Sequence, residues 1–311
     1  MDAFMTLPQK DPQYRMDRES HDFCIRHGEK IDVENYTFCM GGNATNVAVG
    51  LSRLGIKATL CSEIGDDEFS IKIRNALAKE YIDRLFVIEN KDKPSNFAVV
   101  INYRGDRTIF VQDIDREHKY DLSDASAEYV YLTSMGREWQ KPYKDAVKFA
   151  QKHGAKIVFN PGSRQQREGR ATVDHVLRYT EILIVNKEEA GRLVFSENYK
   201  NDSNEHDYIK DLAEKLNKSG PKIVVITNGD RGSFCLDPDG KFHYRPMHPG
   251  EPVERTGAGD SYSSGFLAGL IHGASITDAM HWGSINAAAV VAKIGAQAGL
   301  LTKIELEAKM E

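Results

Sequence analysis

Apolar positions along the chain follow two alternating patterns. Short runs of strand length alternate with longer stretches in which apolar residues recur every three or four positions. This alternation is typical of a mostly parallel sheet with helices on both faces. The pattern predicts strands at 58–64, 129–133, 156–160, 181–186 and 222–227, and helices at 44–54, 68–79, 141–153, 187–195, 206–217, 260–272 and 277–292.

Two regions interrupt the alternation. Residues 95–103 and 107–112 are strand-like runs joined by Arg104-Gly105-Asp106, which is typical of a hairpin turn. Residues 10–40 are charged and irregular, with short strand-like runs inside them. Together these regions predict a small sheet that stands off the main body as a lid. The predicted division gives 41–94 and 114–311 to an α/β core, and 4–40 and 95–113 to a β lid.

Composition and charge exclude several classes of partner. The 311 residues carry 41 basic and 46 acidic side chains, a net charge of −5, which gives no reason to expect nucleic acid or an anionic membrane as a partner. No apolar run approaches the length of a bilayer span, and the first residues lack the layout of a signal peptide. We therefore expect a cytoplasmic protein.

The cysteines predict neither a zinc site nor a disulfide framework. Cys24, Cys39, Cys61 and Cys235 are widely spaced and form no C-x-x-C pair. Because Cys61 and Cys235 lie in apolar, strand-like runs, we expect both to be buried, reduced thiols.

The segment from Glu254 to Leu267 carries the clearest chemistry. Gly257, Ala258 and Gly259 precede Asp260 and a run with helical spacing. A small-residue loop that enters a helix directs unpaired N–H groups toward one point, which makes an anion site. A carboxylate beside that site suits proton removal from a hydroxyl while the N–H groups neutralise a phosphoryl group. An ordinary glycine-rich turn with Asp260 as a cap is the alternative, since short glycine motifs recur by chance.

A second glycine pair opens a helix earlier in the chain. Gly41 and Gly42 allow close approach of the backbone to a ligand, and Asn46 falls in the first turn that follows. The Asn46 amide can both donate to and accept from sugar hydroxyls. The alternative is a tight turn before a core helix, with Asn46 as a cap.

These two segments resemble the two signature regions of the ribokinase-type (PfkB) carbohydrate kinase family, in the right order. The resemblance covers about 300 residues and implies a ribokinase-like fold, an α/β three-layer sandwich with a central mostly parallel sheet and a small β lid. The residues that fit the first signature are Gly41, Gly42, Ala44, Asn46, Ala48, Gly55 and Gly65, and those that fit the second are Gly257, Ala258, Gly259, Asp260, Ser264, Gly265, Phe266 and Leu267.

The resemblance implies roles for the acceptor side of the site. Asp260 matches the catalytic base, and Gly257, Ala258 and Gly259 match the anion hole. Gly42 and Asn46 match sugar-contacting positions. Asp2 resembles a sugar-binding Asp, but the strand that precedes it in relatives is absent, so we expect a truncated chain or a misassigned start.

The resemblance also implies a nucleotide side. Asn186-Lys187-Glu188-Glu189 looks like an N-x-x-E motif in which Glu189 organises magnesium and phosphate through water, although a surface helix start explains it as well. The stretch from Thr227 to Gly232 resembles a T-x-G-x-x-G turn near the nucleotide phosphates, to which Thr227, Gly229 and Gly232 would contribute, and a plain hairpin is its alternative. Asn286 matches a position near the adenine, in a helix whose alanines also suit close packing alone.

The function implied is transfer of a phosphoryl group from ATP to a hydroxymethyl group of a sugar. ATP and Mg²⁺ are the expected cofactors, with a monovalent cation as a further candidate. Glu254 stands where some relatives carry an Asp beside such a cation site, and it keeps the charge on a longer side chain, which argues against activation by potassium. An adenosine-type nucleoside kinase and a non-catalytic paralogue that binds a sugar or nucleoside remain alternatives. The chain would act as a monomer or a homodimer.

Overall fold

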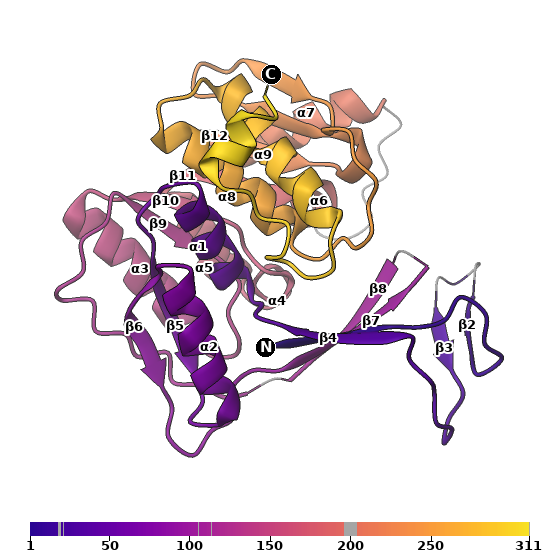
Figure 1. Ribbon diagram of the computed structural model, residues 1–311. Coiled ribbons are helices and arrows are strands. Elements are labelled where there is room, and N and C mark those ends of the chain that lie inside the picture. The colour runs from indigo at the N-terminus through magenta and orange to yellow at the C-terminus, as the bar shows by residue number, and fades with distance from the viewer. Residues whose placement is uncertain (18–19, 21, 105, 113, 196–203, 311) are drawn as a thin grey trace.

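The computed structural model describes residues 1–17, 20, 22–104, 106–112, 114–195 and 204–310. Its centre is a six-stranded sheet in the order β14-β13-β12-β11-β10-β9 (Figure 1). Strands β9 to β12 run parallel, and β13 and β14 are antiparallel additions at one edge. The strands are β9 (Tyr129–Leu132), β10 (Lys156–Phe159), β11 (Thr180–Asn186), β12 (Ile223–Thr227), β13 (Ser233–Leu236) and β14 (Phe242–Arg245).

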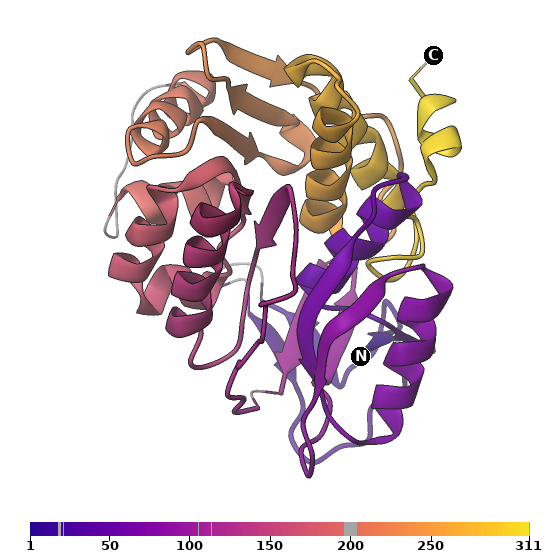
Figure 2. The ribbon, with the colours of Figure 1, turned by 90° about the vertical axis from the view of Figure 1, so that its left-hand side faces the viewer.

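Helices cover both faces of this sheet, as Figure 2 shows, which confirms the predicted three layers. The continuous apolar run of β11 explains the arrangement, because successive side chains of a strand point to opposite faces. Leu183 and Val185 pack into one core cluster, and Ile182 and Ile184 pack into the other. The first face carries α3 (Gln140–His153), α5 (Arg170–Leu177), α6 (Lys187–Val194) and α7 (Glu205–Asn217), and the second carries α1 (Asn43–Arg53), α8 (Ala258–Ile271), α9 (Ile276–Val291) and α10 (Lys303–Glu307).

A parallel pair of strands, β5 (Thr59–Ile64) and β6 (Asp83–Glu89), packs with α2 (Glu68–Lys79) beside α1. The prediction that Cys61 is buried is wrong. Alternation along β5 buries Leu60 and turns Cys61 outward, so the thiol is exposed, whereas Cys235 is buried as expected.

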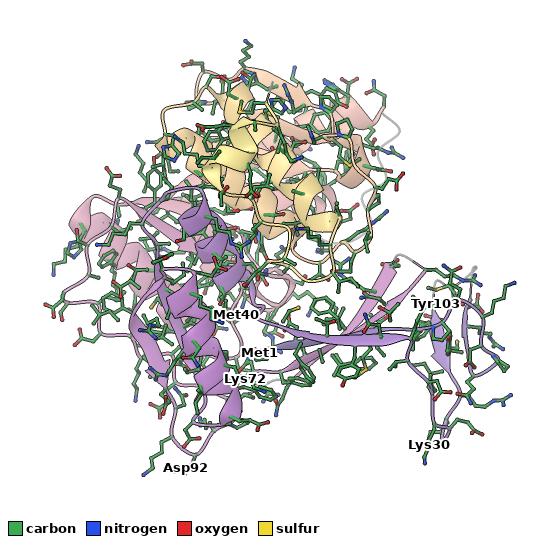
Figure 3. The ribbon with its side chains drawn as sticks, in the orientation of Figure 1. Met1, Lys30, Met40, Lys72, Asp92 and Tyr103 are labelled. Carbon is green, nitrogen blue, oxygen red and sulfur yellow. The ribbon has the colours of Figure 1, made fainter. Side chains whose placement is uncertain are left out.

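The lid is a four-stranded sheet in the order β4-β1-β7-β8, which projects sideways from the core in Figure 1. Strands β7 and β8 pair antiparallel as the hairpin pattern predicts, although Gly105 lies outside the described residues. Figure 3 places Met1 and Met40 where the lid joins the core and Tyr103 near its far end. The strands are β1 (Asp2–Thr6), β4 (Asn35–Cys39), β7 (Ala98–Tyr103) and β8 (Asp106–Val111).

A small ribbon of β2 (Tyr14–Met16) and β3 (Phe23–Ile25) caps the far end of the lid. The rings of Tyr14, Phe23 and Tyr103 meet there with centroids 5.2 to 6.0 Å apart. The sequence pattern missed β1 and β2, and also β6, β14, the short helix α4 (Ser163–Glu168), α5 and α10. Several of these are too short to show a hydrophobic period.

Candidate active site

The start of α8 forms an open group of N–H donors. Gly257 is the N-cap with φ 81°, and the first i to i−4 hydrogen bond runs from the Ser261 N–H to the Gly257 carbonyl at 2.8 Å. The N–H groups of Gly259 and Asp260 therefore precede the intrahelical hydrogen bonds. Gly259 is exposed, and no described atom lies within 4 Å of the position a Cβ would take there. An anion can approach these donors from solvent.

Gly257 is required by close packing as well as by its left-handed backbone. A Cβ at this position would lie 2.6 Å from the Cβ of Ala296, in the loop that follows α9. The small residues of this turn thus bring two distant segments of the chain into contact at the anion site.

Asp260 lies beside the N–H groups, on the first turn of α8. Its side chain is buried, and its Oδ2 accepts a hydrogen bond from Asn46 Nδ2 at 2.8 Å. Burial raises the pKa of Asp260 to about 7, the Asn46 hydrogen bond acts in the opposite direction, and the nearby charge of Glu189 adds to the rise. A carboxyl group with a pKa near neutrality can take up and release a proton at physiological pH.

Asn46 reaches Asp260 because Gly42 opens α1 directly in front of it. Gly42 is the N-cap with φ 97°, a conformation that side chains rarely adopt, and its carbonyl accepts from the Asn46 N–H at 2.9 Å. Asp2 lies against the same turn, since a Cβ on Gly41 would fall 1.8 Å from Asp2 Oδ2. Burial raises the pKa of Asp2, and the amino terminus lowers it in part.

Asn186 and Glu189 form the N-terminal capping box of α6. The Glu189 N–H donates to Asn186 Oδ1 at 2.8 Å, and the Asn186 N–H donates to Glu189 Oε2 at 2.9 Å. This is the helix start that the sequence offered as an alternative, yet burial also raises the pKa of Glu189, and its charge acts on Asp260. The two carboxylates therefore belong to one neighbourhood.

Thr227 lies next to Asn186, because the two are paired residues at the carboxyl ends of the parallel strands β11 and β12. Ligands of doubly wound folds gather at such ends. A 3₁₀ turn at Gly229–Arg231 follows and leads into β13, with the Asn228 N–H donating to the Gly232 carbonyl at 2.8 Å. A Cβ on Gly232 would lie 2.1 Å from the Arg245 carbonyl oxygen, so a glycine is required there.

Asn286 lies inside the protein rather than at a surface. It is fully buried, its Nδ2 donates to the Ser261 carbonyl at 2.9 Å and to Ser264 Oγ at 3.2 Å, and its Oδ1 accepts from the Leu301 N–H at 3.1 Å. These bonds tie α9 to α8 and to the segment before α10. Asn286 therefore holds α9 against α8, which is the packing role that the sequence offered as its alternative.

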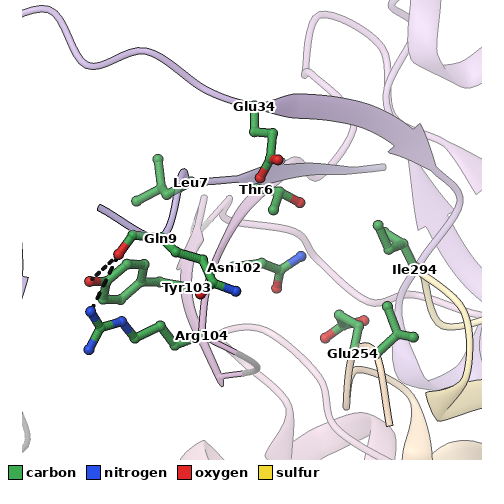
Figure 4. A pocket seen from close by; sticks show the side chains of 10 residues that line it. Thr6, Leu7, Gln9, Glu34, Asn102, Tyr103, Arg104, Glu254 and Ile294 are labelled. Carbon is green, nitrogen blue, oxygen red and sulfur yellow. Dashed lines mark hydrogen bonds between the residues drawn. The ribbon is translucent and has the colours of Figure 1, made fainter. Parts of the chain in front are cut away.

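A pocket of about 450 Å³ opens between the lid and the core. In Figure 4, the Asn102 side chain of the lid points toward Glu254 and Ile294 of the core, whereas Tyr103 and Arg104 point away from them and donate to the Gln9 carbonyl. Sequence patterns carried no signal for most of this lining, because lid and core residues meet only through the fold. Glu254 is almost fully buried, and its Oε1 accepts from both the N–H and the hydroxyl of Thr256, at 2.7 and 2.5 Å.

Within the described ranges, His, Cys, Asp and Glu form no group of three or more that could hold a metal ion without help. Magnesium at phosphoryl-transfer sites typically uses one or two carboxylates together with substrate phosphates, so the single half-buried carboxylate of Glu189 is compatible with such a site. None of the helices described has the length and apolar character that a bilayer crossing demands.

The fold and the comparisons with known proteins together place the chain among phosphotransferases that act on an alcohol group. The sequence profile described as "pfkB family carbohydrate kinase" matches residues 13–303. The chain belongs to this family and is a carbohydrate kinase.

Two curated relatives illustrate the sequence similarity. The ribokinase of Haemophilus influenzae is 27% identical over 289 residues, which cover 91% of each protein. The 5-dehydro-2-deoxygluconokinase of Bacillus subtilis is 27% identical over 297 residues, which cover 89% of each.

Two solved structures illustrate the similarity of fold. Arabidopsis thaliana ribokinase, complexed with ribose and ATP, superposes with a TM-score of 0.76 at 19% identity over all of this chain and 95% of that one. The nucleoside kinase of Burkholderia thailandensis, in complex with inosine, gives 0.76 at 18% identity over 100% and 94%. Both support the ribokinase-like fold with a β lid.

Proposed function

We propose that this chain transfers the terminal phosphoryl group of ATP to a hydroxymethyl group of a sugar, with Asp260 as the base. The observation that carries the proposal is the placement of a buried, hydrogen-bonded carboxylate at the same helix start that presents the N–H groups of Gly259 and Asp260. Phosphoryl transfer requires mainly positioning and charge neutralisation, and this arrangement offers both.

Ionised Asp260 takes the proton of the acceptor hydroxyl, whose oxygen forms a bond to the terminal phosphorus as the bond to the bridging oxygen breaks. The electron pair of that bond leaves with the nucleoside diphosphate. The N–H groups of Gly257, Gly259 and Asp260 would stabilise the negative charge on the transferring oxygens. Ala258 would contribute its place in the turn, because its own N–H already donates to the Arg255 carbonyl at 3.3 Å.

Glu189 and Asn186 are the proposed contacts for Mg²⁺ and the phosphates. The half-buried Glu189 carboxylate, whose charge adds to the rise in the pKa of Asp260, would be stabilised by a divalent cation close to it. Magnesium would neutralise phosphate charge. Thr227, Gly229 and Gly232 would border the nucleotide, since Thr227 pairs with Asn186 at the strand ends. A monovalent cation would bind near Glu254.

Asp2, Gly42 and Asn46 would hold the acceptor, because they surround the turn that faces Asp260. A nucleoside is the second candidate acceptor. The nucleoside kinase of Burkholderia thailandensis, which has a similar fold and binds inosine, supports this candidate. Residues 4–40 and 95–113 would close over either acceptor as a lid.

We also propose that the protein acts in the cytoplasm, as a homodimer or as a monomer. The lid face opposite Asp2 exposes Tyr36, Phe38 and Phe110, which would suit a homodimer, whereas a closed lid over one chain would suit a monomer. A cytoplasmic location fits an ATP-dependent sugar kinase.

The alternative function, a paralogue that only binds its ligand, would not need a base at Asp260. The presence of Asp260 therefore favours the kinase.

An acceptor panel tests the function. The purified chain would be incubated with ATP, Mg²⁺ and in turn ribose, fructose, 5-dehydro-2-deoxygluconate, adenosine and inosine, and ADP release would be followed. Acceptor-dependent release with one member, and a ³¹P spectrum that places the new ester on a primary alcohol, is the expected result. ATP-dependent binding without turnover for every acceptor would favour the non-catalytic alternative.

A further inference from the structure

The loop after α9 contacts both the anion site at Gly257 and the side chain of Asn46, which bonds to Asp260. Ala296 packs against Gly257 at the anion site. The next residue, Gln297, donates from its Nε2 to Asn46 Oδ1 at 2.8 Å, and Asn46 Nδ2 donates in turn to Asp260 Oδ2 at 2.8 Å. A chain of three side chains therefore leads from the loop to the base.

This chain of hydrogen bonds fixes which way the Asn46 amide faces. An amide has one acceptor oxygen and one donor nitrogen, so only one of its two orientations can serve an ionised carboxylate. By donating to the oxygen, Gln297 leaves the nitrogen for Asp260. The reversed amide would bring its oxygen against the carboxylate, which would favour the protonated acid.

The loop itself is held firmly by α1. Arg53 Nη1 donates to the carbonyls of Gln297 and Leu300 at 3.0 and 2.8 Å, while its Nε and Nη2 donate to Glu80 at 2.9 and 2.6 Å. Asn46 and Arg53 are seven residues apart, which is two turns along one face of a helix. Helix α1 thus contacts the loop at two points, and Gln297 takes part in both, through its side chain at Asn46 and through its carbonyl at Arg53.

We infer that Gln297 is a positioning residue of this site: it orients the Asn46 amide so that its N–H faces Asp260, and so keeps the base ionised at the working pH. This inference rests on the proposed function for its catalytic meaning. The other groups whose charge reaches Asp260 are Glu189 of α6 and Tyr131 of β9, and neither touches the Asn46 oxygen that Gln297 occupies.

Three variants distinguish the effect of the Asn46 amide orientation on Asp260 from the effect of an added negative charge. Gln297→Met keeps the length of the side chain and removes the donor. Gln297→Glu replaces the donor by an acceptor, which should turn the Asn46 amide around. Ala298→Glu adds the same charge at the exposed neighbouring residue and serves as the control.

The first readout is the titration of the Asp260 carboxyl by ¹³C NMR in the full chain, assigned with Asp260→Asn. We expect the midpoint to rise by about one pH unit in Gln297→Met, by more in Gln297→Glu, and to stay in place in Ala298→Glu. An unchanged midpoint in both Gln297 variants overturns the inference, and so does an equal rise in all three.

The second readout is kcat/KM against pH with the acceptor that the panel identifies. The acid limb should move to higher pH in the same order, with kcat at high pH largely retained. A uniform loss of kcat without a moved limb would make Gln297 merely structural and overturn the inference. If no acceptor is turned over, the proposed function fails, yet the NMR titration still decides whether Gln297 sets the Asn46 amide.

Discussion

At the scale of single residues, the burial of Asp260 is the feature with the most consequences. The same desolvation that raises its pKa to about 7 would suit the proposed base to neutral solution. The hydrogen bond from Asn46 opposes this rise and keeps the ionised form accessible.

The pH dependence of turnover follows directly. A base must be unprotonated, so kcat/KM should fall as the pH decreases below about 7 and approach a plateau above it. A pH profile of kcat/KM between 5 and 9 measures this. A profile that stays flat down to pH 5 would contradict the assigned base.

The same group predicts an effect on stability. The unfolded carboxyl titrates near 3.8 and the folded one near 7, so the folded chain holds more protons between these values and stability falls as the pH rises through that window. Asp260→Asn removes this loss and should stabilise the fold by a few kcal/mol at pH 8, since each pH unit between the two midpoints corresponds to roughly 1.4 kcal/mol. The gain should vanish near pH 4. Urea unfolding at both pH values measures it, and an equal effect at the two would be inconsistent with a raised pKa.

The sequence could predict functional residues that belong to a local sequence motif. The glycines before Asp260 and Asn46 indicate helix starts. In the structure, Asn46 Nδ2 lies 2.8 Å from Asp260 Oδ2. Gln297 could not be found, because its partner is 251 positions away and a lone Gln has no motif. Cys61 was misplaced because an apolar run does not reveal which face of a strand is covered.

At the scale of elements, the turn into α8 depends on one glycine for two separate reasons. Gly257 has φ 81°, and a Cβ there would lie 2.6 Å from Ala296. Gly28 has the same φ of 81° with no described atom within 4 Å of the added Cβ, so it is a matched control for backbone strain.

Gly28→Ala should cost about 1 kcal/mol, the usual penalty of a left-handed alanine. Gly257→Ala should cost about 1–3 kcal/mol more, since overpacking adds to the strain, and should lower turnover by displacing the N–H groups. Thermal or urea unfolding of both variants gives the difference. Equal costs would mean that the contact with Ala296 has no energetic weight.

The contacts of Arg53 in α1 with the loop after α9, called the clamp below, lead to a second prediction at this scale. Arg53→Met removes a half-buried ion pair with Glu80 and two bonds to carbonyls, and should destabilise the fold by about 2 kcal/mol. Lys303→Met removes a more exposed pair with Glu307 and should change stability by less than about 0.5 kcal/mol. Comparable losses from the two would argue against the clamp.

Long elements with a clear period were predictable, whereas short ones were not. The helix at 68–79 and the strand that became β11 were visible because buried strands are continuously apolar and helices repeat. Strands β1 and β2 have five and three residues, and only their lid partners turn them into a sheet.

At the scale of the whole molecule, the site exists only because distant segments converge. The proposed anion site and base come from α8, the proposed sugar contacts from β1 and α1, and the proposed nucleotide contacts from the ends of β11 and β12. Residues 295–300 pack against Gly257 and bond to Asn46. The order of the signatures indicated the fold, but the pocket between lid and core could not be derived from local patterns.

The most direct test of the account is the turnover of Asp260→Asn with the acceptor that the wild-type chain phosphorylates. ADP release would be measured at pH 8 beside the affinity for ATP. We expect at least about a 100-fold loss of kcat with nucleotide affinity largely retained, since a positioned base contributes that much. Turnover within a few-fold of wild type would contradict it, because the proton would then have to leave by another route.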